Sequence, residues 1–233
     1  MIINFFKQRK VKFLLMSILS LLLCFLLLIK PNTEVNIARY LISNIRLDIP
    51  KAYHYSEYEK RGEWPMINLG IHESAYITID ALLPNLDAVN EHNQHLFKEL
   101  GWGRKIRIRL ILDEMYLLDE IVNSYRDSGL MLQNNIKIEG LQSYKLKMTK
   151  TSKPYKDLFI DNVVESIELV GKCDFENSVT SPSCKFDRIY SNGMHLQYVY
   201  SRNQLKHWKD IDKKVLNLIS SFCTEKNNCL TLK

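Results

Sequence analysis

The sequence predicts an α+β fold with an antiparallel sheet, preceded by one apolar segment. Three observations predict this class. Short segments that alternate apolar and polar residues follow one another along the chain, and few helical segments separate them. The pair Asn192-Gly193 lies between two such segments, which is typical of a β-hairpin. In 203–222, apolar residues recur every three or four positions, which is typical of an amphipathic helix packed on a sheet.

The apolar segment 13–29 contains seventeen residues and no charge. As a helix it would span roughly 26 Å, close to the ~30 Å hydrocarbon core of a bilayer. Four basic residues and no acidic residue precede it, so the positive-inside rule places the tail 1–12 in the cytoplasm. We therefore predict a single-pass inner-membrane anchor, a juxtamembrane connector over 30–44 containing a short helix, and a periplasmic α+β domain over 45–233. If that domain forms two lobes, the break is expected near 127–135.

Two other interpretations of the N-terminus stay open. A cleaved signal peptide has similar basic and apolar regions, but its apolar region is usually about 7–15 residues long and a small-x-small site follows it. Residues 30–35, Lys-Pro-Asn-Thr-Glu-Val, contain no such site. Lipidation of Cys24 would require a small residue before it, and Leu23 stands there. The uncleaved anchor is the favoured interpretation.

The expected elements of the domain follow from their periodicity. The clearest strand is 105–112, in which period two places Ile106 and Ile108 in the core and Arg107 and Arg109 in solvent. The expected strands are 44–49, 75–82, 105–112, 136–138, 141–148, 158–160, 164–170, 186–190 and 195–200. The expected helices are 85–100, 113–126 and 203–222. The tyrosines between the first two strands are expected to pack back on the sheet, with a contact surface as the alternative. They are Tyr53, Tyr55 and Tyr58.

The charge balance argues against one class of function. The chain holds 32 Lys and Arg against 26 Asp and Glu, a net charge of +6. Residues 1–30 contribute five basic residues and no acidic one, so the remainder holds 27 against 26, a net charge of +1. Nucleic-acid binding would need a clustered basic face, and we predict no nucleic-acid partner.

Cysteine usage agrees with export. Four cysteines follow the apolar segment, and an even number in an oxidising compartment predicts two disulfides. The four allow three pairings, of which local pairing, Cys173 with Cys184 and Cys223 with Cys229, is our choice. Free thiols are the alternative. A zinc site is disfavoured because ten and five residues separate the members of each pair, rather than two to four.

Catalytic motifs are missing from the sequence. It contains no Gly-x-Ser-x-Gly elbow, no phosphate-binding glycine loop and no dinucleotide fingerprint. We therefore predict no catalytic residue, no metal and no cofactor, and the protein is not expected to be an enzyme.

Several polar groups have a chemical interpretation beside a structural one. On a helix, His92 and His95 would share a face near Glu91 and Glu99 and could bind a metal, but a solvent-exposed helix is favoured. The run 72–74, His-Glu-Ser, suggests a hydrolase without placing a third group.

The remaining candidates have weaker signals. The histidines His195 and His207 are expected to be structural or exposed. An acidic stretch is expected to be a solvated face, with a partner-binding patch as the second interpretation. Its residues are Asp113, Glu114, Asp119 and Glu120.

Short motifs near both ends of the domain carry a resemblance. Near its start are 49–53, Ile-Pro-Lys-Ala-Tyr, and 81–86, Ala-Leu-Leu-Pro-Asn-Leu. Near its end are a cysteine pair, 198–200, Tyr-Val-Tyr, and Leu205 and Trp208 in a helix that runs to Phe222. Together they resemble small envelope proteins of Gram-negative bacteria found beside type VI secretion effectors. The likeness covers 45–222 loosely, its motifs are structural rather than catalytic, and it transfers no toxin-binding residue.

The resemblance implies an immunity function, because those proteins are similar to immunity proteins against periplasmic lipases and cell-wall toxins. We expect a membrane-anchored periplasmic binding protein that neutralises a secreted antibacterial effector of lipase or cell-wall type. Its partners would be the inner membrane, through 13–29, and the effector. The first alternative is a structural accessory subunit of an envelope assembly or secretion machine; the second is an envelope hydrolase. Because Cys24 lacks a lipobox, this would be an anchored rather than a lipidated member.

Overall fold

The computed structural model describes residues 37–56, 59, 70–113, 117–163, 166–191 and 193–225. The chain divides into two compact units, 1–36 and 37–233, and all described residues belong to the second. The predicted cytoplasmic tail and the anchor over 13–29 lie outside them. In the described part of the chain, no helix is both long enough and apolar enough to cross a membrane.

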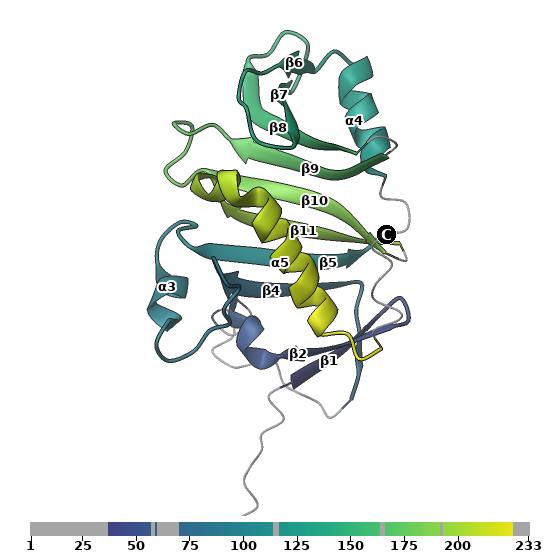
Figure 1. The fold of residues 1–233 in the computed structure, drawn as a ribbon, viewed down its shortest axis with the longest axis vertical. Helices are drawn as coiled ribbons and strands as arrows, with labels where there is room; N and C mark the ends of the chain where they lie inside the picture. The colour runs from purple at the N-terminus through teal and green to yellow at the C-terminus, as the bar shows by residue number, and fades with distance from the viewer. Residues whose placement is uncertain are drawn as a thin grey trace, which may run out of the picture. The chain divides into compact units, whose positions relative to one another are not determined.

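Antiparallel sheet dominates the unit 37–233 (Figure 1). The main sheet has eight strands in the order β4-β5-β11-β10-β9-β8-β7-β6, and each neighbouring pair is antiparallel. Strands that precede residues 127–135 in the chain and strands that follow them belong to this one sheet. With the C-terminal helix, this confirms the predicted sheet-dominated α+β class. The strands are β4 (Tyr76–Leu82), β5 (Lys105–Leu112), β6 (Met131–Gln133), β7 (Leu141–Lys147), β8 (Pro154–Val163), β9 (Ser166–Asp174), β10 (Ser183–Ser191) and β11 (Met194–Ser201).

A second, three-stranded sheet has the order β2-β1-β3. Its strands are β1 (Ile37–Ile42), β2 (Ile45–Pro50) and β3 (His72–Glu73). The end of the last helix joins this sheet, because the backbone N–H of Asp48 donates to the carbonyl of Phe222 at 2.8 Å. The helical elements are η1 (Lys51–Tyr53), α3 (Gln94–Lys98), α4 (Leu118–Asp127), η2 (Arg202–His207) and α5 (Trp208–Ser221).

Helix α5 crosses one face of the main sheet, the inner face, and the principal core lies between them (Figure 1). On this face Phe186 of β10 stacks with Tyr198 and Tyr200 of β11, with ring centroids 5.6 and 5.5 Å apart. The helix buries apolar residues at the predicted helical spacing. They are Trp208, Ile211, Val215, Leu216 and Ile219.

A buried polar network joins α5 to the inner face. The Tyr198 hydroxyl donates to Asp212 Oδ1 at 2.7 Å, and Arg188 Nη1 lies 2.9 Å from Asp212 Oδ2. Burial raises the pKa of Tyr198 well above its usual value. Burial also raises the pKa of the Asp212 carboxyl, and the Arg188 charge and the Tyr198 hydrogen bond oppose that rise. Burial of the Asp212 carboxylate is therefore compensated by these two partners together.

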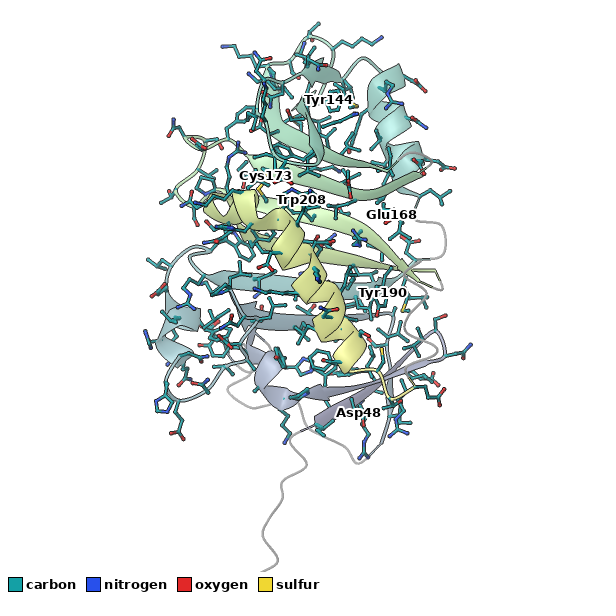
Figure 2. The ribbon with its side chains drawn as sticks, in the orientation of Figure 1. Asp48, Tyr144, Glu168, Cys173, Tyr190 and Trp208 are labelled. Carbon is teal, nitrogen blue, oxygen red and sulfur yellow. A yellow bond between two sulfur atoms is a disulfide. The ribbon has the colours of Figure 1, made fainter. Side chains whose placement is uncertain are left out.

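A β-bulge in β9 changes the face on which its side chains lie. The register shifts between Asp161 and Asn162 of β8, which leaves Glu168 as the extra residue of β9. Glu168 (Figure 2) therefore reaches Arg188 on the inner face, at 3.3 Å. Ile167 packs on the opposite face, in the cluster beneath α4.

Two predicted helices are wrong, the first completely and the second over most of its length. The short helix expected in the connector 30–44 is instead strand β1, which pairs with β2 and β3. The helix expected over 85–100 is reduced to the five residues of α3. Before α3, Asn90 Oδ1 accepts the backbone N–H groups of His92 and Asn93, and such local bonds compete with helix formation.

Other boundaries shift by a few residues. The helix expected over 113–126 begins at Leu118, and the helix expected over 203–222 starts as the 3-10 helix η2. The strand expected over 136–138 is irregular apart from a single bridge between Ile138 and Leu141.

One predicted disulfide is present. Cys173 and Cys184 are paired neighbours on β9 and β10, and their sulfurs are bonded. Cys223 is buried after α5, where its backbone forms an isolated antiparallel β-bridge with Leu47 of β2. Its predicted partner, Cys229, lies outside the described residues, so this second pairing stays a prediction.

The close approach of Gly171 to the Phe186 ring gives a test of the core. A Cβ at Gly171 would overlap the ring, which is itself held in the stack with Tyr198 and Tyr200. We expect Gly171→Ala to lower the free energy of unfolding by about 1–3 kcal/mol, measured by urea denaturation. Gly70→Ala is the control, because nothing lies within 4 Å of that position. Equal stability of the Gly171→Ala variant and the parent would contradict this packing.

Candidate functional site

The face of the main sheet opposite α5 is covered only in part by the described residues. Helix α4 covers it over the strands from β6 to β9. A small cluster of Tyr55, Leu82 and Phe97 covers one end of β4. Between them, β4, β5, β11 and β10 present twelve positions in three rows, which we call the open face. The rows are Tyr76, Ile111, His195 and Ile189; Thr78, Arg109, Gln197 and Asp187; and Asp80, Arg107, Val199 and Lys185.

The open face presents positive charge to solvent. Arg109 is exposed, and the side chains of Arg107 and Lys185 are 37% and 44% exposed. The two carboxylates of this face are buried beneath their neighbours, since the side chains of Asp80 and Asp187 are 9% and 2% exposed. A molecule that approaches this face therefore meets cations before it meets carboxylates.

Each carboxylate of the open face holds a neighbour in place. Asp80 Oδ1 accepts from Arg107 Nε at 2.8 Å, while Asp80 Oδ2 accepts the backbone N–H of Ser56 at 2.9 Å. Asp187 Oδ1 accepts from Gln197 Nε2 at 2.9 Å and lies 3.9 Å from Lys185 Nζ. These bonds hold Arg107 and Gln197 in place, so these side chains lose less conformational entropy when a partner binds.

A cavity of about 260 Å³ adjoins the third row. Aromatic and charged side chains share its lining, a composition that is common in the energetically dominant parts of protein interfaces. The lining includes Tyr55, Phe97 and Trp102, with Glu59, Lys105 and Arg107. The cavity thus extends the open face toward α3 and could receive one side chain of a partner.

The first row of the open face is apolar at both ends. Tyr76 is 61% exposed and Ile189 is 37% exposed. Exposed tyrosine beside exposed arginine is typical of protein-binding surfaces. The open face therefore combines an apolar row with cationic rows.

His195, which was predicted to be structural or exposed, lies in the first row and is buried. Burial lowers the pKa of its imidazole, as does Lys185, while Asp187 and Asp113 raise it. The neutral form is therefore favoured in the folded protein.

The other predicted candidates are not brought together. His92 lies in a turn before α3 and His95 within it, so they do not share a helix face, and the described residues contain no cluster of three potential metal ligands. In the run 72–74, the Ser74 hydroxyl donates to the backbone carbonyl of Tyr76. His207 is exposed at the end of η2.

The acidic stretch is divided among several roles. Asp119 Oδ1 accepts the backbone N–H of Ile167 at 3.1 Å, which ties α4 to β9. Glu120 is exposed on α4, and Glu114 lies outside the described residues. The charge of Asp113 raises the pKa of His195. A single acidic patch is not formed by the described members.

Some residues of the site gave little signal in the sequence. The periodicity of β5 indicated that Arg107 and Arg109 face outward, but nothing local linked them to Lys185 on β10. His54 was also missed; it is buried and its Nδ1 lies 3.1 Å from the carbonyl of Thr78, so that nitrogen donates. Tyr53 and Tyr55 pack inward as expected, against Phe222 and Phe97.

Two solved structures share the fold of this chain. One is Smlt3025, an immunity protein of the Stenotrophomonas maltophilia type IV secretion system, with a TM-score of 0.54 and 15% identity over 82% of this chain and 94% of that one. The other is FrpD, an iron-regulated outer membrane lipoprotein of Neisseria meningitidis, with a TM-score of 0.55 and 15% identity over 82% and 93%. No protein-family model and no curated protein matches the sequence. At this identity the likeness shows a common fold.

The buried imidazole of His195 predicts a pH dependence of stability. Because its pKa is lowered in the folded state from the ordinary 6.5, the unfolded chain binds more protons below that pH, and stability falls as the pH falls. We expect His195→Gln to reduce this loss between pH 7.5 and about pH 5, measured by urea unfolding at a series of pH values. His207→Gln, at an exposed position, is the control. Parallel pH profiles for His195→Gln and the parent would contradict the assignment.

Proposed function

We propose that the protein is a membrane-anchored periplasmic binding protein that neutralises a secreted antibacterial effector. The observation that carries this proposal is the fold shared with an immunity protein over most of both chains. The open face adds support, because Arg107, which Asp80 holds in place, and the adjoining cavity suit recognition of another protein. Neutralisation by binding requires affinity and needs no chemical step of its own.

The secretion route of the effector is not part of the proposal. The short sequence motifs resemble proteins found beside type VI effectors, whereas Smlt3025 belongs to a type IV system. Both are consistent with a secreted effector as the partner, and the lipase or cell-wall type is proposed from the sequence resemblance alone. The effector is proposed as the protein partner.

The proposed location rests on the N-terminal sequence. Residues 13–29 would anchor the chain in the inner membrane, with the basic tail in the cytoplasm and the domain in the periplasm. The disulfide between Cys173 and Cys184 fits this oxidising compartment. Tethering would raise the local concentration of the domain at the membrane, where a lipase acts.

A second candidate function follows from the likeness to FrpD. That protein is an outer membrane lipoprotein with the same fold, so the fold also occurs in a lipoprotein of the cell envelope. A structural accessory subunit of an envelope assembly is therefore the alternative. It predicts partners within that assembly rather than a toxin.

The topology is tested with reporter fusions after Lys233. We expect alkaline phosphatase fused there to be active, because that enzyme forms its disulfides only after export. β-Galactosidase at the same position should be inactive. The reverse pattern would place the domain in the cytoplasm and remove the location proposed here.

The immunity function is tested by growth. The full-length chain is co-expressed with each adjacent gene product, directed to the periplasm, and cell survival is counted. We expect one of these products to be toxic and the full-length chain to restore growth, while an unrelated anchored periplasmic domain does not. Toxicity without protection would favour the accessory alternative.

A further inference from the structure

We propose that the open face is the docking surface for a carboxylate-rich protein partner, with Arg109 and Lys185 as its principal contacts. The proposal rests on the proposed function and deepens it, because it assigns the binding surface and the chemistry of the effector's contact region. Three features of the structure support it.

The first feature is the concentration of charge. Outside residues 1–30 the chain has a net charge of only +1, from 27 basic and 26 acidic residues. On the open face, Arg107, Arg109 and Lys185 are accessible while both carboxylates are buried. A surface of this kind attracts acidic partners and raises their association rate.

The second feature is the alignment of two arginines on β5, one of which is held in place by Asp80. Asp80 engages Arg107 through Nε, and the two terminal nitrogens of the guanidinium are not part of that hydrogen bond. Arg109 lies two residues further along β5 on the same face, opposite Thr78 and Gln197. The strand places the two arginines in line, and each guanidinium can bind a carboxylate through paired N–H groups.

The third feature favours a protein over a nucleic acid or an anionic membrane. Tyr76 and Ile189 give the open face an exposed apolar row, and protein interfaces bury such residues in their centres. A phosphate backbone would instead require a continuous series of cations, since its affinity comes mainly from charge neutralisation. The open face instead has three cationic side chains, confined to two of its three rows.

The test uses a double charge reversal and a matched control. Arg109→Glu with Lys185→Glu changes the open face, while Lys206→Glu with Lys213→Glu makes the same change of charge at exposed positions of η2 and α5. Thr78→Glu is a further variant, which places a carboxylate opposite Arg109 without removing a native cation. Thermal unfolding of each full-length protein in detergent micelles establishes that it is folded.

Binding is measured with poly-L-glutamate as the acidic probe, and with a DNA duplex and phosphatidylglycerol vesicles as the competing classes. We expect poly-L-glutamate to bind the parent and the control pair equally, and the Arg109/Lys185 pair at least about tenfold more weakly. Thr78→Glu should weaken binding in the same direction. Equal binding by all variants, or a face-dependent preference for DNA or vesicles, would overturn the proposal.

Growth protection separates this proposal from the proposed function. If the parent and the control pair neutralise an adjacent toxin and the Arg109/Lys185 pair does not, both proposals are supported. Protection that survives the Arg109/Lys185 change overturns the docking surface and leaves the immunity function standing. Probe binding that maps to the open face without protection by any variant overturns the immunity function alone.

Discussion

The hydrogen bond from Tyr198 to Asp212 is the contact on which the arrangement of the domain depends. It lies beneath α5, where Arg188 completes the partners of the carboxylate. A rotation of the helix would leave Asp212 buried without them, and an uncompensated buried charge costs about 3–5 kcal/mol. The helix is therefore held in one orientation, and the apolar stripe that it carries covers the inner face. Strand periodicity then directs the alternate residues to the opposite side.

That separation of faces explains how the domain can serve as a binding protein. The inner face contains the stack of Phe186 with its neighbours and the close approach of Gly171, so changes there disturb packing. The open face carries Arg109 and Gln197, whose side chains are not part of the core. Its chemistry can change without loss of the fold, which agrees with a fold shared at 15% identity with Smlt3025 and FrpD.

The elements that depend on local pattern were predictable. Period two identified β5 with its outward arginines, and helical spacing identified α5. The connector was mistaken because Ile37, Leu41 and Ile42 also fit helical spacing; pairing with β2 and burial of Ile42 select a strand. Before α3 the expected helix does not form, because the backbone N–H groups of His92 and Asn93 donate to Asn90 Oδ1 instead of to helical carbonyls.

The sequence by itself determined the apolar N-terminal segment, the antiparallel α+β class and the amphipathic last helix, because each depends on a short stretch of chain. The sequence allowed three cysteine pairings, and the neighbouring positions of Cys173 on β9 and Cys184 on β10 decided which one formed. Only the tertiary structure decided the candidate site. Arg109 and Lys185 share a face because β11 lies between β5 and β10. His195 is buried there, although its local pattern resembles that of an exposed residue. Strand order and burial arise from pairing between distant segments, and the packing of the whole sheet selects that pairing.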